Sequence, residues 1–184
     1  MILHLFRRPS RNPNIASLYG MIVAQARSPE FYRVYGVPDT VNGRFEMIAL
    51  HTVLFLDRFE HETPAVRRLG QGVFDLFCRD MDASMREMGV GDLAVPRKMR
   101  RIGAAFYERQ GEYRSALAAA DDVSLEAALA RNVFDAASPS DGAGRLALYV
   151  RATERTLAGQ PFEALMRCEL RFPAPETVGS PVEA

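Results

Sequence analysis

The chain has 184 residues, of which 48% are hydrophobic and 25% are charged, a balance typical of globular proteins. A chain of this length is expected to fold as one domain with its own core. Its 23 lysines and arginines equal its 23 aspartates and glutamates, so the formal net charge is zero. This balance excludes a strong overall attraction to nucleic acid, and we expect no specific nucleic-acid partner.

Two short segments are locally basic, namely Arg7–Arg11 and Arg97–Arg101. A solvated face or a flexible tail accounts for each, with contact to phosphate or to an anionic membrane surface as the alternative. The order of residues in Met1–Pro13 is unlike a secretory signal. The longest strongly apolar stretch, Ala49–Leu56, is shorter than the roughly 18 residues of a membrane span. We therefore expect a cytoplasmic protein that is soluble or lies on a membrane surface.

Helical periodicity dominates the sequence and strand alternation is almost absent, which predicts an all-α fold. We expect a single compact domain of about seven to eight helices. Residues 1–13 should form an irregular basic segment, residues 14–173 the helical domain, and residues 174–184 a disordered tail. The expected helices cover about 14–27, 29–35, 43–60, 63–88, 96–119, 125–134, 142–157 and 161–168.

The helix expected over about 43–60 is apolar on nearly every side, which predicts that it is central and buried. Either Thr40 or Asn42 is placed to cap its first turn. The helix carries His51. One interpretation makes this histidine a polar contact at the floor of a groove. The more ordinary one makes it a partly buried side chain bonded to a backbone carbonyl or a carboxylate.

The next two helices, about 63–88 and 96–119, hold a segment rich in methionine, aromatic residues and charge. Thr63 is expected to cap the first helix, and Gly89 to end it in the left-handed conformation. Pro96 suits the first turn of the second helix. Two stripes of side chains run along the first of these helices at helical spacing. The apolar stripe is Phe74, Phe77, Cys78, Met81, Met85 and Met88, and the charged stripe is Asp75, Arg79, Asp82 and Arg86.

The rest of the chain offers fewer signals. The segment Ser138–Gly144 is expected to be a flexible loop, with Asp141 as a cap for the helix that follows it. Cys78 and Cys168 are the only cysteines, and neither belongs to a Cys-x-x-Cys pair. They are expected to be buried, reduced thiols.

No motif for catalysis, metal binding or cofactor binding occurs in the sequence. It has no His-Glu-x-x-His motif, no phosphate-binding loop and no Gly-x-Ser-x-Gly motif. We therefore expect no metal, no cofactor and no enzymatic activity. The alternative is a magnesium-dependent helical enzyme acting on a prenyl or lipid substrate, with Asp75 and Asp82 near the metal. Arg79 and Arg86 lie on the same helix face and are nearer partners for these carboxylates, which weakens the alternative.

The methionine-rich stripe also has two interpretations. Packing in the core is the default, whereas flexible methionines also suit a groove that binds apolar polypeptide segments. Phe106 and Tyr107 would extend such a groove, and charged side chains would border it. The candidate partner-binding residues are Met81, Met85, Met88, Met99, Asp80, Asp82, Arg86, Glu87, Asp92, Arg97 and Lys98.

A more specific pattern occurs in three regions. The first is Tyr19–Arg27, and the second combines Phe31–Tyr32, Gly36–Thr40 and Gly43–Met47. The third combines Asp80–Asp82, Arg86–Asp92 and Val95–Met99. In these regions the chain resembles the ubiquinol–cytochrome c chaperone family. Members of that family are assembly factors of respiratory complex III in mitochondria and in bacteria. The resemblance extends from about Ile15 to about Pro173, and the short N-terminal segment is similar to the bacterial form.

The resemblance implies a non-enzymatic function in the assembly of the ubiquinol–cytochrome c reductase complex. It implies that the client is newly made cytochrome b, bound by protein–protein contacts. It also implies a second assembly factor as partner, and peripheral contact with the inner membrane or the ribosome. It assigns no catalytic residue and no cofactor to any position of this chain.

Overall fold

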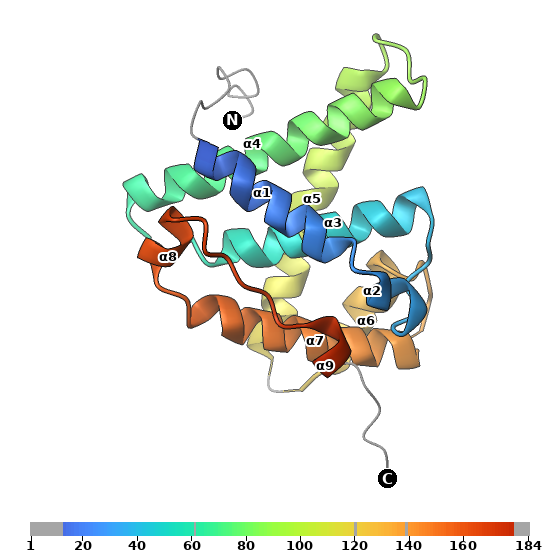
Figure 1. Ribbon diagram of the computed structural model, residues 1–184. Helices are drawn as coiled ribbons and strands as arrows, with labels where there is room; N and C mark the ends of the chain where they lie inside the picture. The colour runs from blue at the N-terminus through green and yellow to red at the C-terminus, as the bar shows by residue number, and fades with distance from the viewer. Residues whose placement is uncertain (1–12, 61, 120, 139, 179–184) are drawn as a thin grey trace.

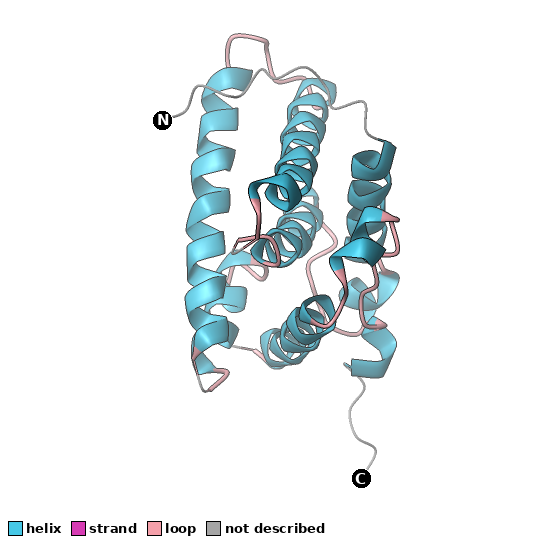
Figure 2. Cartoon of the chain, turned by 90° about the vertical axis from the view of Figure 1, so that its left-hand side faces the viewer, coloured by secondary structure: helices cyan, strands magenta, loops and turns pink. Residues whose placement is uncertain are grey.

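Nine helices and no strand make up the part of the chain that the computed structural model describes, residues 13–178 without 61, 120 and 139 (Figures 1 and 2). The all-α prediction is confirmed, and eight of the nine helices correspond to the expected ones. They are α1 (Pro13–Ala26), α2 (Pro29–Arg33), α3 (Val41–Asp57), α4 (Pro64–Glu87), α5 (Val95–Ala118), α6 (Val123–Asn132), α7 (Asp141–Ala158), α8 (Phe162–Met166) and α9 (Pro175–Val178).

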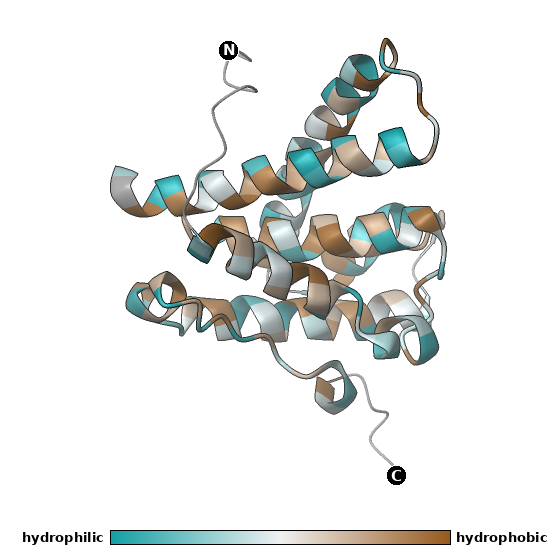
Figure 3. Ribbon diagram, turned by 45° about the horizontal axis from the view of Figure 1, so that its top comes forward, coloured by the Kyte–Doolittle hydropathy of each residue, from teal (hydrophilic) through white to brown (hydrophobic). Residues whose placement is uncertain are grey.

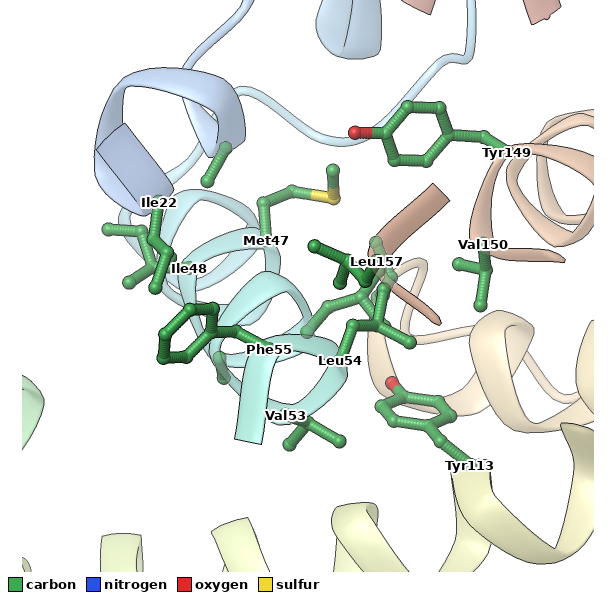
Figure 4. Packing of buried hydrophobic residues seen from close by; sticks show 14 of the residues in the cluster. Ile22, Met47, Ile48, Val53, Leu54, Phe55, Tyr113, Tyr149, Val150 and Leu157 are labelled. Carbon is green, nitrogen blue, oxygen red and sulfur yellow. The ribbon is translucent and has the colours of Figure 1, made fainter. Parts of the chain in front are cut away.

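Helix α3 lies at the centre of the fold, as its apolar composition predicts. It contacts α1, α4, α5 and α7, so that side chains on all its faces are buried. Figure 4 shows Met47, Val53 and Phe55 of α3 among side chains from the surrounding helices. Burial of this many large apolar side chains, each worth about 1.5–3 kcal/mol, is the main stabilising term for the fold.

Hydroxyl side chains cap three of the long helices. The Thr40 hydroxyl accepts a hydrogen bond from the Gly43 amide at 3.1 Å, so Thr40 rather than Asn42 caps α3. The Thr63 hydroxyl caps α4 as expected. At α7, however, Ser140 is the cap and Asp141 is already the first helical residue. The prediction of Asp141 as the cap was therefore wrong, because serine one residue earlier satisfies the same free amides.

The C-terminal segment lies against the helices. After α8 the chain runs across the fold to α9 (Figure 1). Gln160 bonds both the amide and the carbonyl of Arg171, each at 2.8 Å. The Tyr35 hydroxyl donates to the Pro175 carbonyl at 2.7 Å, and Pro175 is buried. The sequence predicts a disordered tail from 174, whereas Pro175–Val178 form α9 and the Tyr35 contact holds its first residue. The rest of the expected tail, 179–184, lies outside the described residues. The expected irregular segment lies outside the described residues, apart from Pro13.

His51 is fully buried beneath this C-terminal segment. Its Nδ1 lies 2.8 Å from the Met47 carbonyl and its Nε2 lies 3.0 Å from the Tyr149 hydroxyl. Because a carbonyl only accepts, Nδ1 carries the proton and Nε2 accepts from Tyr149. Burial lowers the pKa of His51 to about 4, so the imidazole is neutral at pH 7. The interpretation of His51 as a histidine bonded to a backbone carbonyl is confirmed, although the side chain is fully rather than partly buried.

A second buried polar contact joins α3 to α5. The guanidinium of Arg109 donates to both carboxylate oxygens of Glu46, at 2.7 and 2.8 Å. Glu46 is buried on α3, a position where the sequence pattern gave no sign of a polar partner. Burial raises the pKa of Glu46 even though Arg109 acts to lower it. The pair therefore fixes how α5 lies against α3 more than it adds to stability.

Candidate interaction surface

Helices α4 and α5 form a helical hairpin in which the two helices cross steeply, and its closed end projects from the rest of the fold (Figure 1). The turn between them is held at a fixed shape by its backbone. The Val90 amide bonds the Met85 carbonyl and the Gly89 amide bonds the Arg86 carbonyl, both at 3.0 Å. Gly89 has φ of +80°, the left-handed conformation expected for it. This pattern is a Schellman motif, which ends α4 and leaves the turn exposed.

The structure divides the methionine stripe into two parts. Met81 and Met85 are only 7% and 6% exposed, because they face the interior of the fold. Met99 is partly buried against the same core. Met88 lies beyond the last turn of α4 and is 57% exposed. The four methionines therefore do not line one open groove, and only Met88 is largely available to a partner.

Leu93 is the most exposed large apolar side chain of the described residues, at 99%. It lies in the hairpin turn, close in sequence to Met88. Figure 3 shows hydrophobic residues in this turn next to hydrophilic ends of the two helices. Leu93 is not among the residues that the sequence predicts for this surface, because a single leucine between turn residues has no periodic partner. A large aliphatic residue inside a short, glycine-containing turn between two long helices was the available signal.

Arg86 organises the charged residues of the hairpin end. Its Nε bonds Asp82 one turn earlier at 2.7 Å, and its guanidinium also contacts Asp92 in the turn. These hydrogen bonds raise the pKa of Arg86, with the bond to Asp82 as the largest cause. Both pairs are exposed to solvent, so their effect is to orient the turn rather than to stabilise the protein.

The remaining charged candidates fall in two groups. Asp80 accepts a hydrogen bond from the Tyr19 hydroxyl of α1 at 2.7 Å, so it ties α4 to α1 and does not border the turn. Glu87, Arg97 and Lys98 are exposed, and within the described residues they form no ion pair. Charged side chains that form no ion pair within their own protein are the ones that most easily form an ion pair with a partner protein.

The two carboxylates that would lie near a magnesium ion in the alternative interpretation bind other side chains of this protein instead. Asp75 accepts from Gln71 at 2.8 Å, and Asp82 is held by Arg86. Within the described residues, no group of three or more histidine, cysteine, aspartate or glutamate side chains is arranged to hold a metal ion. The structure thus gives Asp75 and Asp82 no shared site.

Three further observations concern the described part of the chain. None of its helices combines the length and the apolar character that crossing a bilayer requires. Cys78 and Cys168 are both half-buried free thiols, and burial raises the pKa of Cys78 to about 11. Cys78 is therefore almost entirely protonated at pH 7, which makes it a poor nucleophile.

The fold and this surface together define a class: an all-helical protein with a projecting hairpin whose turn exposes apolar side chains between charged ones. Comparison with known proteins narrows the class. The family profile described as ubiquinol-cytochrome C chaperone matches residues 33–172. The chain belongs to this ubiquinol–cytochrome c chaperone family, as its sequence pattern predicts.

Two relatives place the chain within the family. The crystal structure of the Cbp3 homolog from Brucella abortus matches with a TM-score of 0.83 and 39% identity, over 97% of this chain and 99% of that one. Ubiquinol-cytochrome-c reductase complex assembly factor 1 from Xenopus laevis is 26% identical over 118 residues, or 64% of this chain. The matched region spans 58% of that curated relative's length.

Proposed function

We propose that this protein is an assembly chaperone for the ubiquinol–cytochrome c reductase complex and that it binds newly made cytochrome b through the end of the α4–α5 hairpin. The observation that carries the proposal is the pair of exposed apolar side chains, Met88 and Leu93, on a turn of fixed shape. Membership of the chaperone family and the name of the Xenopus relative support the complex as the target.

The hairpin end has the properties that a transient apolar contact needs. A partner that covers Leu93 removes a fully exposed side chain from water, which is worth about 1.5–3 kcal/mol. Because the Schellman turn and Arg86 already hold the backbone, little conformational entropy is lost on binding. A single small apolar contact of this kind suits a client that must later be released.

Charged residues at the start of α5 give the contact its direction. Arg97 and Lys98 follow the turn directly, and both are exposed. Loops and termini of a membrane protein that carry carboxylates would pair with them, while an apolar segment of the client covers the turn. Contact with a second assembly factor, with the inner membrane or with the ribosome belongs to the same proposal and rests on the family alone.

Substitutions at the hairpin turn test the proposal. We expect Leu93→Asp, and to a smaller extent Met88→Asp, to reduce capture of cytochrome b from membranes in a pull-down by about tenfold, the effect of losing 1.4 kcal/mol. Both side chains are exposed, so the variants should melt at the temperature of the wild type. Met85→Asp is unsuitable, because Met85 is buried and a charge there would unfold the protein.

Leu148→Asp is the matched control, because Leu148 is an exposed apolar residue on a different helix, α7. The control should capture cytochrome b as well as the wild type does. If folded Leu93→Asp captures as much cytochrome b as Leu148→Asp, the hairpin end is not the client surface.

A further inference from the structure

A cationic pocket lies at the corner where α1, α2 and α3 meet, away from the hairpin turn. Its volume is about 260 Å³, and it is lined by Arg27, Pro29, Tyr32, Arg33, Asp39 and Arg44. In Figure 1 this corner lies at the right-hand edge of the molecule, where α2 leads into the first turn of α3. The proposed client contact uses none of these side chains, and of them Tyr32 also packs against the buried core.

The pocket has more positive charge than its own carboxylate can balance. Arg44 bonds Asp39 through Nε at 2.6 Å, and this bond holds the pKa of Asp39 below its usual range. Among the described residues, Arg27 and Arg33 form no ion pair. Two guanidinium groups therefore face the pocket without a counterion, beside a third that is held in place by Asp39.

A hydrogen bond and a close backbone contact hold the walls of the pocket in place. The Tyr32 hydroxyl donates to the Ala26 carbonyl at 3.0 Å, which fixes the ring between the end of α1 and α2. The loop before α3 is pressed against the helix at Gly43, where an added Cβ would lie 2.0 Å from the Pro38 carbonyl oxygen. Only glycine permits this approach, and it places Asp39 and Arg44 on the pocket's edge.

Arginines with this arrangement select a particular chemistry. A guanidinium presents several donors in a planar fork, which matches the oxygens of a phosphate group and can bind it in a bidentate manner. Inorganic phosphate or a phosphate monoester carries up to about two negative charges and would balance both unpaired arginines, and a phosphodiester headgroup would balance one. Val34 and Val41 are exposed on the flanking segments, so the rim is apolar where the floor is cationic.

The geometry points to a binding site for a phosphate group, held by Arg27 and Arg33 beside the Arg44–Asp39 pair. The phosphate belongs either to a lipid headgroup or to a soluble phosphate. A lipid would additionally place Val34 and Val41 against the acyl region of a bilayer, whereas a soluble phosphate would leave them in water.

The test measures binding of a lipid headgroup and of a soluble phosphate to the full chain, in the absence of any client. The lipid arm is flotation at low ionic strength with vesicles of phosphatidylcholine, with and without phosphatidylglycerol. The soluble arm is thermal melting in inorganic phosphate against chloride at equal ionic strength. We expect Arg33→Glu to weaken binding in the responding arm by at least about fivefold, the effect of one basic residue at an anionic surface.

Arg100→Glu is the matched control, because Arg100 is exposed on α5 and belongs to the other basic segment of the chain. The control should bind within about twofold of the wild type, since screening limits the effect of a distant charge. Dependence on Arg33 in the vesicle arm assigns a lipid headgroup, and dependence in the melting arm assigns a soluble phosphate. If Arg33→Glu loses no more binding than Arg100→Glu in either arm, the site does not exist. The client surface is tested separately and is unaffected by that result.

Discussion

His51 is the residue whose protonation the fold changes most clearly. Its pKa falls from 6.5 to about 4 because burial disfavours the imidazolium form. Between these two pH values the unfolded chain binds a proton that the native protein does not. Stability contributed by neutral His51 is therefore complete above pH 6.5 and is lost as pH falls, by roughly 3 kcal/mol near pH 4.

We expect the difference in unfolding free energy between wild type and His51→Gln to be larger at pH 7.5 than at pH 5, because glutamine does not titrate. Urea denaturation at the two pH values measures it. Glu46 has its pKa shifted upward and so changes stability in the opposite direction, but it is present in both proteins and cancels. An equal difference at both pH values would show that His51 is not buried as the neutral form.

The hairpin turn is the element whose shape depends on one backbone angle. Gly89 has φ of +80°, whereas Gly91, two residues later, does not have a positive φ. We expect Gly89→Ala to lower the unfolding free energy by about 1 kcal/mol, since alanine is strained in the left-handed region. Gly91→Ala should leave it nearly unchanged, because an added Cβ there has no heavy atom within 4 Å. Equal melting temperatures for the two variants would contradict this account of the turn.

Sequence periodicity predicts the helices well because each long one has an apolar face, and α3, α4 and α7 also begin at a hydroxyl cap. It predicts the candidate surface less well. Met81, Met85 and Met88 all fit one helical stripe, yet only Met88 is exposed, because α4 ends at Glu87 and the stripe continues past the packed helix. The pairing of Glu46 with Arg109, and of Asp80 with Tyr19, joins residues more than 60 positions apart. Such contacts depend on how helices cross, which periodicity does not specify.

At the scale of the whole molecule, the C-terminal segment holds the ends of the fold together. It runs across the fold from α8 to α9, and it covers the polar group of His51, Tyr149 and Gln25, of which His51 and Tyr149 are fully buried. Gln25 donates to both the Tyr149 hydroxyl and the Pro173 carbonyl, at 2.9 and 3.1 Å. This group therefore links the first helix, the central helix and the C-terminal segment into one cooperative unit.

Phe172 is the side chain through which the C-terminal segment contacts that unit, since its ring meets the His51 ring edge-on at a centroid distance of 5.5 Å. We expect Phe172→Ala to lower the unfolding free energy by about 2 kcal/mol, less than for a fully buried phenylalanine because the ring is half-buried. Urea denaturation measures the loss, and hydrogen exchange should show faster exchange at the Arg171 amide, which Gln160 protects.

Arg171→Ala is the matched control, because its side chain is exposed and Gln160 bonds only its backbone. If Phe172→Ala and Arg171→Ala are equally stable, the C-terminal segment rests on its backbone hydrogen bonds and Phe172 does not anchor it.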